Sequence, residues 1–507
     1  MFSKVFSSQT NLLDAHIIDI EVDISKGLHK FSVVGLPDKA VEESRDRVSA
    51  AIKNSGFKSP KSRNQKIVIA LAPANIKKEG PNFDLGIALA YLLATEEIEF
   101  NPSDKIFLGE LALDGKLRKI KGVLPLVKKA KEEGFKEIYL PKENVLEGAL
   151  IEGIEVYGVE NLSQLLKHLN IGLKNKELIK PQPLTKIKLD NLNYEIDFCD
   201  IKGQETAKRG LEISAAGGHN IAMFGPPGTG KTMLAKAFCY VLPPLSFDDI
   251  LEVTSIHSVA GVLSKGIITH PPLRSPHHTS SHVSVVGGGT FPKPGEVTLA
   301  HKGVLFVDEF PEFNRQVIDS LRQPLEDKII SISRAKGTAV FPANFILIAT
   351  MNPCPCGNYQ SKHECTCSSN QINNYQRKIS GPIVDRIDMW TEVSKIEYSK
   401  LSEKTNNGDS TELIRTRVVK ARQKQKERFG SEKTNSDMSA KDIEKYIQLS
   451  PQVKELLNKS AQNINLSARA YHKIIKLSRT IADLDNSNEI LIKHLMEALT
   501  YRPKNKN

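Results

Sequence analysis

Short apolar runs alternate with amphipathic stretches along much of this chain, which is the pattern of an α/β protein. Near the N-terminus, apolar and acidic residues alternate from Ile17 to Ile24, as expected of a strand with one buried face. The charged stretch from Val127 to Glu133 has a helical pattern and stops before Gly134. We therefore expect residues 1–170 to form a separate α/β domain.

A polar, basic and proline-containing stretch at residues 171–193 has the composition of a linker. Beyond it, continuous apolar runs indicate strands that are buried on both faces, as in a parallel sheet. These runs are Ile221 to Phe224, Val304 to Val307 and Phe345 to Met351. From residue 395 onward the pattern is helical. The chain is thus predicted to contain a parallel-sheet core at 194–394 and a helical domain at 395–507.

The segment after the first of these runs matches G-x-x-x-x-G-K-S/T and precedes a helix predicted from Met233 to Val241. Its glycines let backbone N–H groups turn toward phosphate oxygens, and the helix N-terminus adds partial positive charge. Lys231 would reach the β- and γ-phosphates, and the Thr232 hydroxyl would bind Mg²⁺. A nucleoside triphosphate site is predicted over Gly225, Pro226, Pro227, Gly228, Thr229, Gly230, Lys231 and Thr232.

Two carboxylates, Asp308 and Glu309, follow the second apolar run and are expected at the carboxyl edge of the sheet. Asp308 would hold Mg²⁺, while Glu309 would orient and deprotonate the attacking water. Asn352 ends the third run, where its amide could position the same water. Together with the phosphate loop, these residues predict hydrolysis of the triphosphate rather than binding alone.

Two arginines extend this series of motifs. Arg386 lies in the segment from Ile379 to Asp388, and Arg469 opens a predicted helix. In this order the motifs resemble an AAA+ ATPase, with Asn352 as sensor 1, Arg386 as arginine finger and Arg469 as sensor 2. The resemblance implies a ring, usually a hexamer, because the finger acts on the neighbouring subunit's nucleotide. A solvated surface charge is the alternative for each arginine.

Composition is compatible with a cytoplasmic protein of several domains. Of the 507 residues, 40% are hydrophobic and 25% are charged, as in ordinary globular proteins. The chain has no apolar run long enough to span a bilayer, and its start lacks the apolar core of a signal peptide. The formal net charge of +11 favours a polyanionic partner such as DNA, although a solvated basic surface would give the same value.

Four of the six cysteines lie close together as two C-x-C pairs, Cys354 with Cys356 and Cys365 with Cys367. Such pairs can place four thiolates around one tetrahedral Zn²⁺. His363 could replace one ligand, and redox-active or unliganded thiols are the alternatives. Four thiolates leave no open position, so a bound zinc would be structural rather than catalytic.

Two further segments offer less specific chemistry. The histidine-rich stretch from His270 to His282 could bind metal or face a ring pore, but its spacing fits no standard ligand set, and we expect no metal there. The stretch from Ile329 to Phe341 predicts a hairpin with Arg334 and Lys336 near its tip. Such a hairpin would suit a DNA backbone, and an ordinary surface hairpin would look the same.

The N-terminal domain resembles the proteolytic domain of Lon proteases, which use a Ser-Lys dyad. The resemblance is carried by three stretches, Lys78 to Asp84, Gly109 to Arg118 and Gly134 to Asn144. The position that matches the serine is Asn82, and the position that matches the lysine is Leu124. The resemblance therefore implies a retained fold without peptide hydrolysis.

The chain as a whole resembles the ComM/YifB family of bacterial magnesium-chelatase-like AAA+ ATPases. The residues that carry this likeness, besides the Lon-like domain, are Arg274 to Thr279, Pro294 to His301 and Asn352 to Gly357. The resemblance implies an α/β protein with a Lon-like domain, an AAA+ core and a helical lid. It also implies an ATP-driven hexameric motor that migrates branched DNA in recombination or natural transformation. A magnesium-chelatase-type motor subunit and a protein unfoldase without protease activity are the alternatives.

Overall fold

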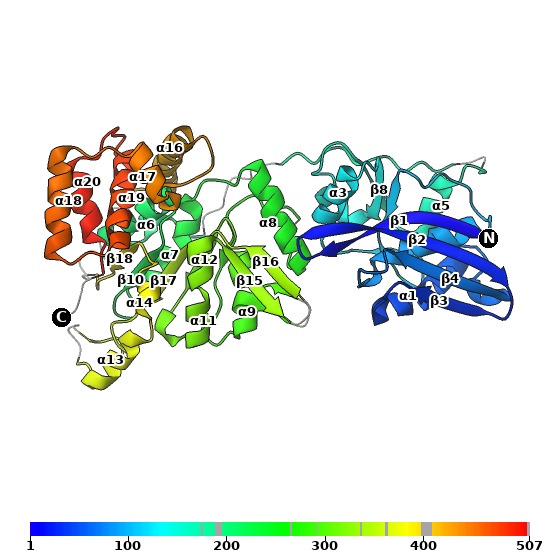
Figure 1. Cartoon of the computed structure of the whole chain (residues 1–507), viewed down its shortest axis with the longest axis horizontal. Coiled ribbons are helices and arrows are strands. Elements are labelled where there is room, and N and C mark those ends of the chain that lie inside the picture. Colours follow the sequence, from blue (N-terminus) through cyan, green and yellow to red (C-terminus); the bar gives the residue numbers. More distant parts are fainter. Residues whose placement is uncertain are drawn as a thin grey trace. The chain divides into compact units, whose positions relative to one another are not determined.

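The computed structural model describes residues 1–173, 176–187, 195–263, 266–289, 292–334, 337–359, 364–396 and 408–503 (Figure 1). Contacts divide the chain into two compact units. The first consists of Met1–Lys188 and Ile250–Ile268, and the second of Leu189–Asp249 and Thr269–Asn507. Among the described residues, no helix combines the length and apolar character that a membrane crossing requires.

The first unit is built on a mixed seven-stranded sheet with the order β3-β4-β2-β1-β5-β8-β9. Its strands are β1 (Phe2–Asn11), β2 (Asp14–Lys26), β3 (Lys30–Val34), β4 (Gln65–Ala72), β5 (Lys105–Phe107), β8 (Glu137–Pro141) and β9 (Glu155–Val159). The β1–β2 and β2–β4 pairs are antiparallel, whereas the other pairs are parallel. In β2 the side chains of Ile18, Ile20, Val22 and Ile24 are buried and the acidic residues between them are more exposed, which confirms the predicted alternation.

Helices complete the first unit. They include α1 (Lys39–Asn54), α2 (Asp84–Ala94), α3 (Val123–Glu132) and α5 (Leu162–Leu169). The α3 helix confirms the helical pattern predicted before Gly134. The unit also takes in the larger part of α8 (Phe247–Ala260), a segment inserted in the sequence of the second unit. There the Ser258 hydroxyl accepts a hydrogen bond of 2.9 Å from the Gly122 N–H.

The end of the first unit differs from the predicted boundary at residue 170, because part of the predicted linker binds to it. The Gln182 N–H donates to the Val156 carbonyl at 2.8 Å, and the Thr185 N–H donates to the Ala149 carbonyl at 2.9 Å. A polar, proline-containing sequence suits an extended segment at a sheet edge as well as it suits a free linker. Composition alone could not separate these two states.

The second unit contains a five-stranded sheet in which every neighbouring pair is parallel, with the order β11-β14-β17-β10-β18. The strands are β10 (Ile221–Phe224), β11 (Leu273–Arg274), β14 (Val304–Val307), β17 (Ile346–Met351) and β18 (Met389–Glu392). The three predicted apolar runs correspond to β10, β14 and β17, so the predicted parallel sheet is confirmed. Phe224 is in register with Met351, and Val307 with Ala349, which brings the carboxyl ends of these strands to one edge.

Helices and a hairpin surround this sheet. The helices are α6 (Glu205–Gly217), α7 (Lys231–Val241), α9 (His282–Val286), α10 (Glu296–Leu299), α11 (Arg315–Ser320), α12 (Arg322–Asp327), α13 (Ser369–Arg377) and α14 (Gly381–Val384). The predicted hairpin is confirmed as the antiparallel pair β15 (Ile329–Arg334) and β16 (Gly337–Pro342). Lys336 and the side chain of Arg334 lie outside the described part of the chain.

The C-terminal region is helical, as predicted (Figure 1, orange to red). Its helices are α16 (Thr411–Phe429), α17 (Ala440–Tyr446), α18 (Pro451–Asn463), α19 (Ala468–Leu484) and α20 (Ile492–Thr500). Buried Val418 and Ile481 share one hydrophobic cluster with Leu211 of α6 and Phe238 of α7. The predicted boundary between residues 394 and 395 therefore does not separate two cores, since the helices and the sheet are packed as one unit.

Candidate active site

The predicted phosphate loop connects β10 to α7 at the carboxyl edge of the sheet. Its first residue is tied to the neighbouring strand, since the Gly225 N–H donates to the Met351 carbonyl at 3.2 Å. Gly228 and Gly230 have φ values of +74° and +87°, in the left-handed region that favours glycine. A Cβ at either position would meet nothing within 4 Å. The loop therefore leaves open space beside the N-terminus of α7, as a phosphate cradle requires.

Lys231 is the buried cation of this cradle. Its ammonium group donates to the Gly225 carbonyl at 2.7 Å, the Pro226 carbonyl at 2.9 Å and Asn352 Oδ1 at 3.1 Å. Burial lowers the pKa of Lys231 to about 8, although the nearby carboxylates of Asp308 and Glu309 act in the opposite direction. The three acceptors are uncharged, so anionic phosphate oxygens would compete with them effectively.

Oxygen ligands suited to Mg²⁺ meet beside this lysine. Thr232 Oγ1 donates to Asp308 Oδ2 at 3.0 Å, and the Glu309 N–H donates to Asp308 Oδ1 at 3.1 Å. Thr350, which is fully buried in β17, also donates from its hydroxyl to Asp308 Oδ1. A hydroxyl and a carboxylate are the hard donors that Mg²⁺ prefers, so the residues fit the predicted ion. Sequence analysis missed Thr350, whose one signal was a hydroxyl inside an apolar run.

Glu309 stands at the end of β14 in a conformation that is costly for a non-glycine residue. Its φ is +53°, and its side chain is 51% exposed. His278 Nδ1 lies 3.8 Å from Glu309 Oε2. The neighbouring His277 bonds locally, with Nδ1 at 2.8 Å from Thr279 Oγ1. The histidine-rich segment thus supplies a neighbour to Glu309, a role that sequence analysis did not consider.

The two predicted arginines meet at one carboxylate. Arg386 Nε lies 3.0 Å from Glu326 Oε2, and an Nη atom of Arg469 also bonds to that oxygen. Burial works to raise the pKa of Glu326, but the Arg469 and Arg386 guanidinium groups together hold it below its usual value. Glu326 belongs to α12, so the predicted finger, Arg386, and the predicted sensor 2, Arg469, both contact the same helix.

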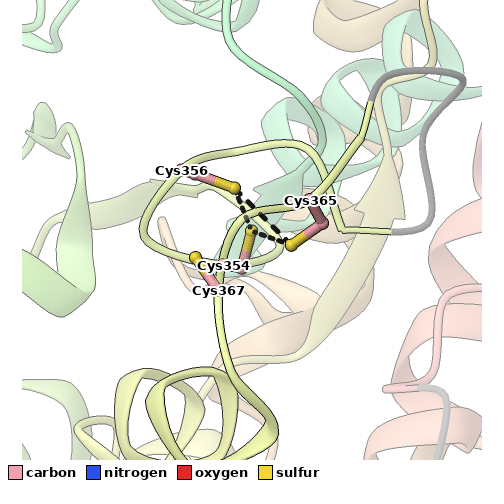
Figure 2. A group of neighbouring side chains, drawn as sticks. All are labelled: Cys354, Cys356, Cys365 and Cys367. Atoms are coloured by element: carbon pink, nitrogen blue, oxygen red, sulfur yellow. Dashed lines mark hydrogen bonds between the residues drawn. The ribbon is translucent and has the colours of Figure 1, made fainter.

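The four predicted cysteines come together directly after Asn352 (Figure 2). Their Sγ atoms all lie within 4.8 Å of one another, and among the described residues no other such group of possible metal ligands occurs. The Tyr359 N–H donates to Cys354 Sγ at 3.3 Å. A hydrogen bond from the Asn358 backbone is the main cause that lowers the pKa of Cys356 to about 6. His363, the alternative ligand, lies outside the described residues.

The first unit offers no dyad at the positions matched to Lon. Asn82 lies in a 3₁₀ turn, Pro81–Phe83, and its carbonyl accepts a hydrogen bond from the Gly109 N–H at 3.0 Å. Leu124 is 2% exposed within α3. An amide is not a serine-type nucleophile and an aliphatic side chain is not a base, so these two residues cannot form that catalytic pair.

Comparisons with known proteins place these motifs in a family. Residues 197–401 match the family model "Magnesium chelatase, subunit ChlI", residues 20–144 match "Subunit ChlI of Mg-chelatase", and residues 408–502 match "Magnesium chelatase, subunit ChlI C-terminal". The chain is 41% identical to competence protein ComM of Haemophilus influenzae over 504 residues, which cover 98% of this chain and 97% of that protein.

Two other relatives match this chain, one over most of its length and one over a short stretch. Uncharacterized protein YifB of Escherichia coli is 41% identical over 492 residues, covering 97% of this chain and 95% of that protein. DNA repair protein RadA of Streptococcus pyogenes is 37% identical over 93 residues, covering 18% of this chain and 20% of that protein. The chain therefore belongs to the ComM/YifB family of magnesium-chelatase-like AAA+ ATPases, for which ATP and Mg²⁺ are the implied cofactors.

Proposed function

We propose that this protein is an ATP-driven ring motor that moves on DNA, as a helicase or branch-migration enzyme in recombination or natural transformation. The observation that carries the proposal is the similarity to a competence protein over nearly the full length of both chains. The shorter match to a DNA repair protein supports DNA as the substrate, and so does the net charge of +11. Such a motor would work in the cytoplasm, where it meets the DNA.

ATP hydrolysis would fall to the residues at the carboxyl edge of the parallel sheet. Mg²⁺, when bound with the triphosphate, neutralises charge on the phosphate oxygens. Thr232 and Asp308 would hold it, and Lys231 would exchange its uncharged acceptors for phosphate oxygens. Glu309 would orient the attacking water and accept its proton, while Asn352 would fix the position of that water.

Arg386 and Arg469 would serve the nucleotide of the neighbouring subunit. Both form ion pairs with Glu326 of their own chain, which supports a common task on one surface. Guanidinium groups that enter a neighbour's site stabilise the charge that develops during phosphoryl transfer. This arrangement requires a closed ring, and we expect a hexamer.

The remaining parts of the chain would support this motor. The first unit would keep a Lon-like fold without peptidase activity, given Asn82 and Leu124 at the matched positions. The hairpin β15–β16 would contact the DNA backbone. The C-terminal helices would act as the lid of the ATPase core, and the four cysteines would hold a structural Zn²⁺.

A second candidate is a motor subunit for metal insertion into a tetrapyrrole, which the names of the matching family models favour. A protein unfoldase is the third. Purified full-length protein with ATP should be tested on forked and four-way DNA, on casein, and in a chelatase reconstitution. We expect unwinding or migration of the DNA substrates and ATP hydrolysis that DNA stimulates.

The matched control is Glu309→Gln, which keeps the shape of the side chain but removes the base. This variant should bind ATP and DNA while its turnover falls to background. A protein that hydrolyses ATP at a rate indifferent to DNA, and that leaves every DNA substrate unchanged, would rule out the proposed function. A normal turnover rate in the Glu309→Gln variant would instead refute only the role given to that residue.

A further inference from the structure

The turn that follows Cys354 and Cys356 is packed against the phosphate loop, so a metal bound by the cysteines could affect the shape of that loop. We propose that a Zn²⁺ ion held by Cys354, Cys356, Cys365 and Cys367 acts as a clamp that fixes the phosphate loop in its nucleotide-binding shape. The inference rests on the proposed ATPase function and concerns what keeps that site assembled.

The sulfur positions fit a tetrahedral metal. Cys354 Sγ lies 3.4 Å from Cys356 Sγ and 3.7 Å from Cys365 Sγ, and the latter two atoms are 3.6 Å apart (Figure 2). Sulfurs bound to one zinc at about 2.3 Å lie about 3.8 Å apart at the corners of a tetrahedron. Disulfide-bonded sulfurs would be about 2.0 Å apart. Three of the four sulfurs are therefore at nearly the spacing that a single ion requires, and Cys367 Sγ lies within 4.8 Å of each of them.

The backbone around Cys354 is already arranged as the outer shell of a metal site. The Gly357 N–H donates to the Cys354 carbonyl at 3.0 Å, which closes a tight turn, and the Tyr359 N–H donates to Cys354 Sγ at 3.3 Å. Backbone N–H groups directed at sulfur stabilise thiolates and orient them toward a metal. Cys354 itself is fully buried, so its sulfur lies inside the turn rather than at the surface.

The same turn touches the phosphate loop. Gly357 has a φ of +80°, and a Cβ placed on it would lie only 2.5 Å from Cδ of Pro227. The turn backbone is thus pressed against the exposed part of the phosphate loop. On the other side of the turn, Asn352 accepts the hydrogen bond from Lys231, and Gln376 of α13 donates to the Pro353 carbonyl at 3.2 Å. A metal that holds the turn therefore also holds the surroundings of the lysine.

Metal content gives the first test. Full-length protein purified under reducing conditions should contain about one zinc per chain by elemental analysis. The Cys356→Ser and Cys365→Ser variants should lose it, while Cys199→Ser, which changes a cysteine outside the cluster, should retain it. Zinc at background level in the wild-type protein, iron in its place, or disulfides among the four cysteines would each overturn the proposal.

The clamp is tested separately by nucleotide affinity, measured with a fluorescent, non-hydrolysable ATP analogue and Mg²⁺. Gly357→Ala keeps all four thiols but forces the turn away from Pro227, so zinc should remain while affinity falls about tenfold or more. Gly430→Ala is the control, because Gly430 has a φ of +65° and open space around it. Unchanged affinity in both Gly357→Ala and Cys356→Ser would overturn the clamp. Neither readout involves DNA, so a failure of the motor function would be seen separately.

Discussion

The meeting of Arg386 and Arg469 at Glu326 leads to a prediction about which nucleotide each arginine serves. Both guanidinium groups form an ion pair with the same carboxylate oxygen, so the two nitrogens nearest to it are less than about 6 Å apart. Two guanidinium groups this close can reach the same phosphate group, and we infer that they serve the same nucleotide. If Arg386 is an arginine finger, Arg469 must also reach across the subunit interface.

Single substitutions set the scale of the effect. A finger arginine contributes on the order of 10³-fold or more to turnover, so Arg386→Ala should reduce the ATPase rate by about that factor. ATP binding to the phosphate loop of the variant subunit should be unchanged. Loss of the ion pair between Arg386 and Glu326 should cost about 1 kcal/mol of folding stability, because Glu326 is 42% exposed, although Arg386 itself is 20% exposed. A large drop in activity without a large drop in stability would mark a functional rather than a structural role.

Mixing subunits then separates the two possible arrangements. Arg386→Ala and Glu309→Gln subunits are mixed in equal amounts before the ring assembles. At some interfaces an Arg386→Ala subunit, which keeps Glu309, then receives the intact Arg386 of a Glu309→Gln neighbour. These make up about one quarter of all interfaces, so about one quarter of the wild-type ATPase rate should return. Arg469→Ala mixed with Glu309→Gln should recover the same fraction.

The decisive mixture is Arg386→Ala with Arg469→Ala. If both arginines project from one subunit onto its neighbour's nucleotide, every interface lacks one of them and the ATPase rate stays at the level of the single variants. If Arg469 served the nucleotide of its own subunit, about one quarter of the interfaces would be complete, and activity would return. Recovery in this mixture would therefore refute the reasoning from Glu326.

Three further predictions follow from individual contacts. Thr350→Val should raise the Mg²⁺ concentration needed for half-maximal ATPase activity about tenfold or more, because a hydrogen bond to the charged Asp308 is worth about 1.5–3 kcal/mol; an unchanged Mg²⁺ requirement would contradict this. His278→Ala should slow turnover without weakening ATP binding, since His278 Nδ1 lies 3.8 Å from Glu309 Oε2, the carboxylate proposed to activate water; equal effects on both would point to a general structural loss. Burial lowers the pKa of His219 to about 4, below the 6.5 of an exposed histidine, so the unfolded state binds the proton more readily, and the stability present at pH 7 is lost as pH falls below about 6.5. Between pH 7 and 5 the wild type should lose about 2 kcal/mol more than His219→Gln, measured by thermal unfolding, and parallel pH profiles would exclude this role.

The nucleotide site was largely predictable from sequence because its chemistry is local. The phosphate loop needs glycines and a lysine at fixed spacing, and the parallel strands that precede Asp308 and Asn352 are mostly apolar runs. The contacts that sequence analysis missed, Thr350 to Asp308 and His278 to Glu309, join residues 31 to 42 positions apart in the chain. No local pattern encodes such a pairing, because strand order in the sheet decides it.

The domain boundaries were harder to predict for a related reason. A polar sequence with prolines shows that a segment is extended, but whether it hangs free or binds an edge depends on partners elsewhere, such as Val156 for Gln182. Likewise, the change to a helical pattern at residue 395 suggested a division, while the buried faces of α16 and α19 share a core with α6 and α7. Amphipathic patterns reveal that a face is buried, and they do not reveal which partner buries it.

The insertion Ile250–Ile268 has a consequence for the order in which the protein can fold during its synthesis. The first unit is complete only when this segment has left the ribosome, after the phosphate loop and α7 have already emerged. Until then the Gly122 N–H lacks its Ser258 acceptor, so this contact of the first unit cannot form. The first unit can therefore complete its packing only after residues 250–268 have been made, and a fragment that ends at Lys188 would lack that segment. The two units are therefore interleaved in the sequence, although each is compact by itself.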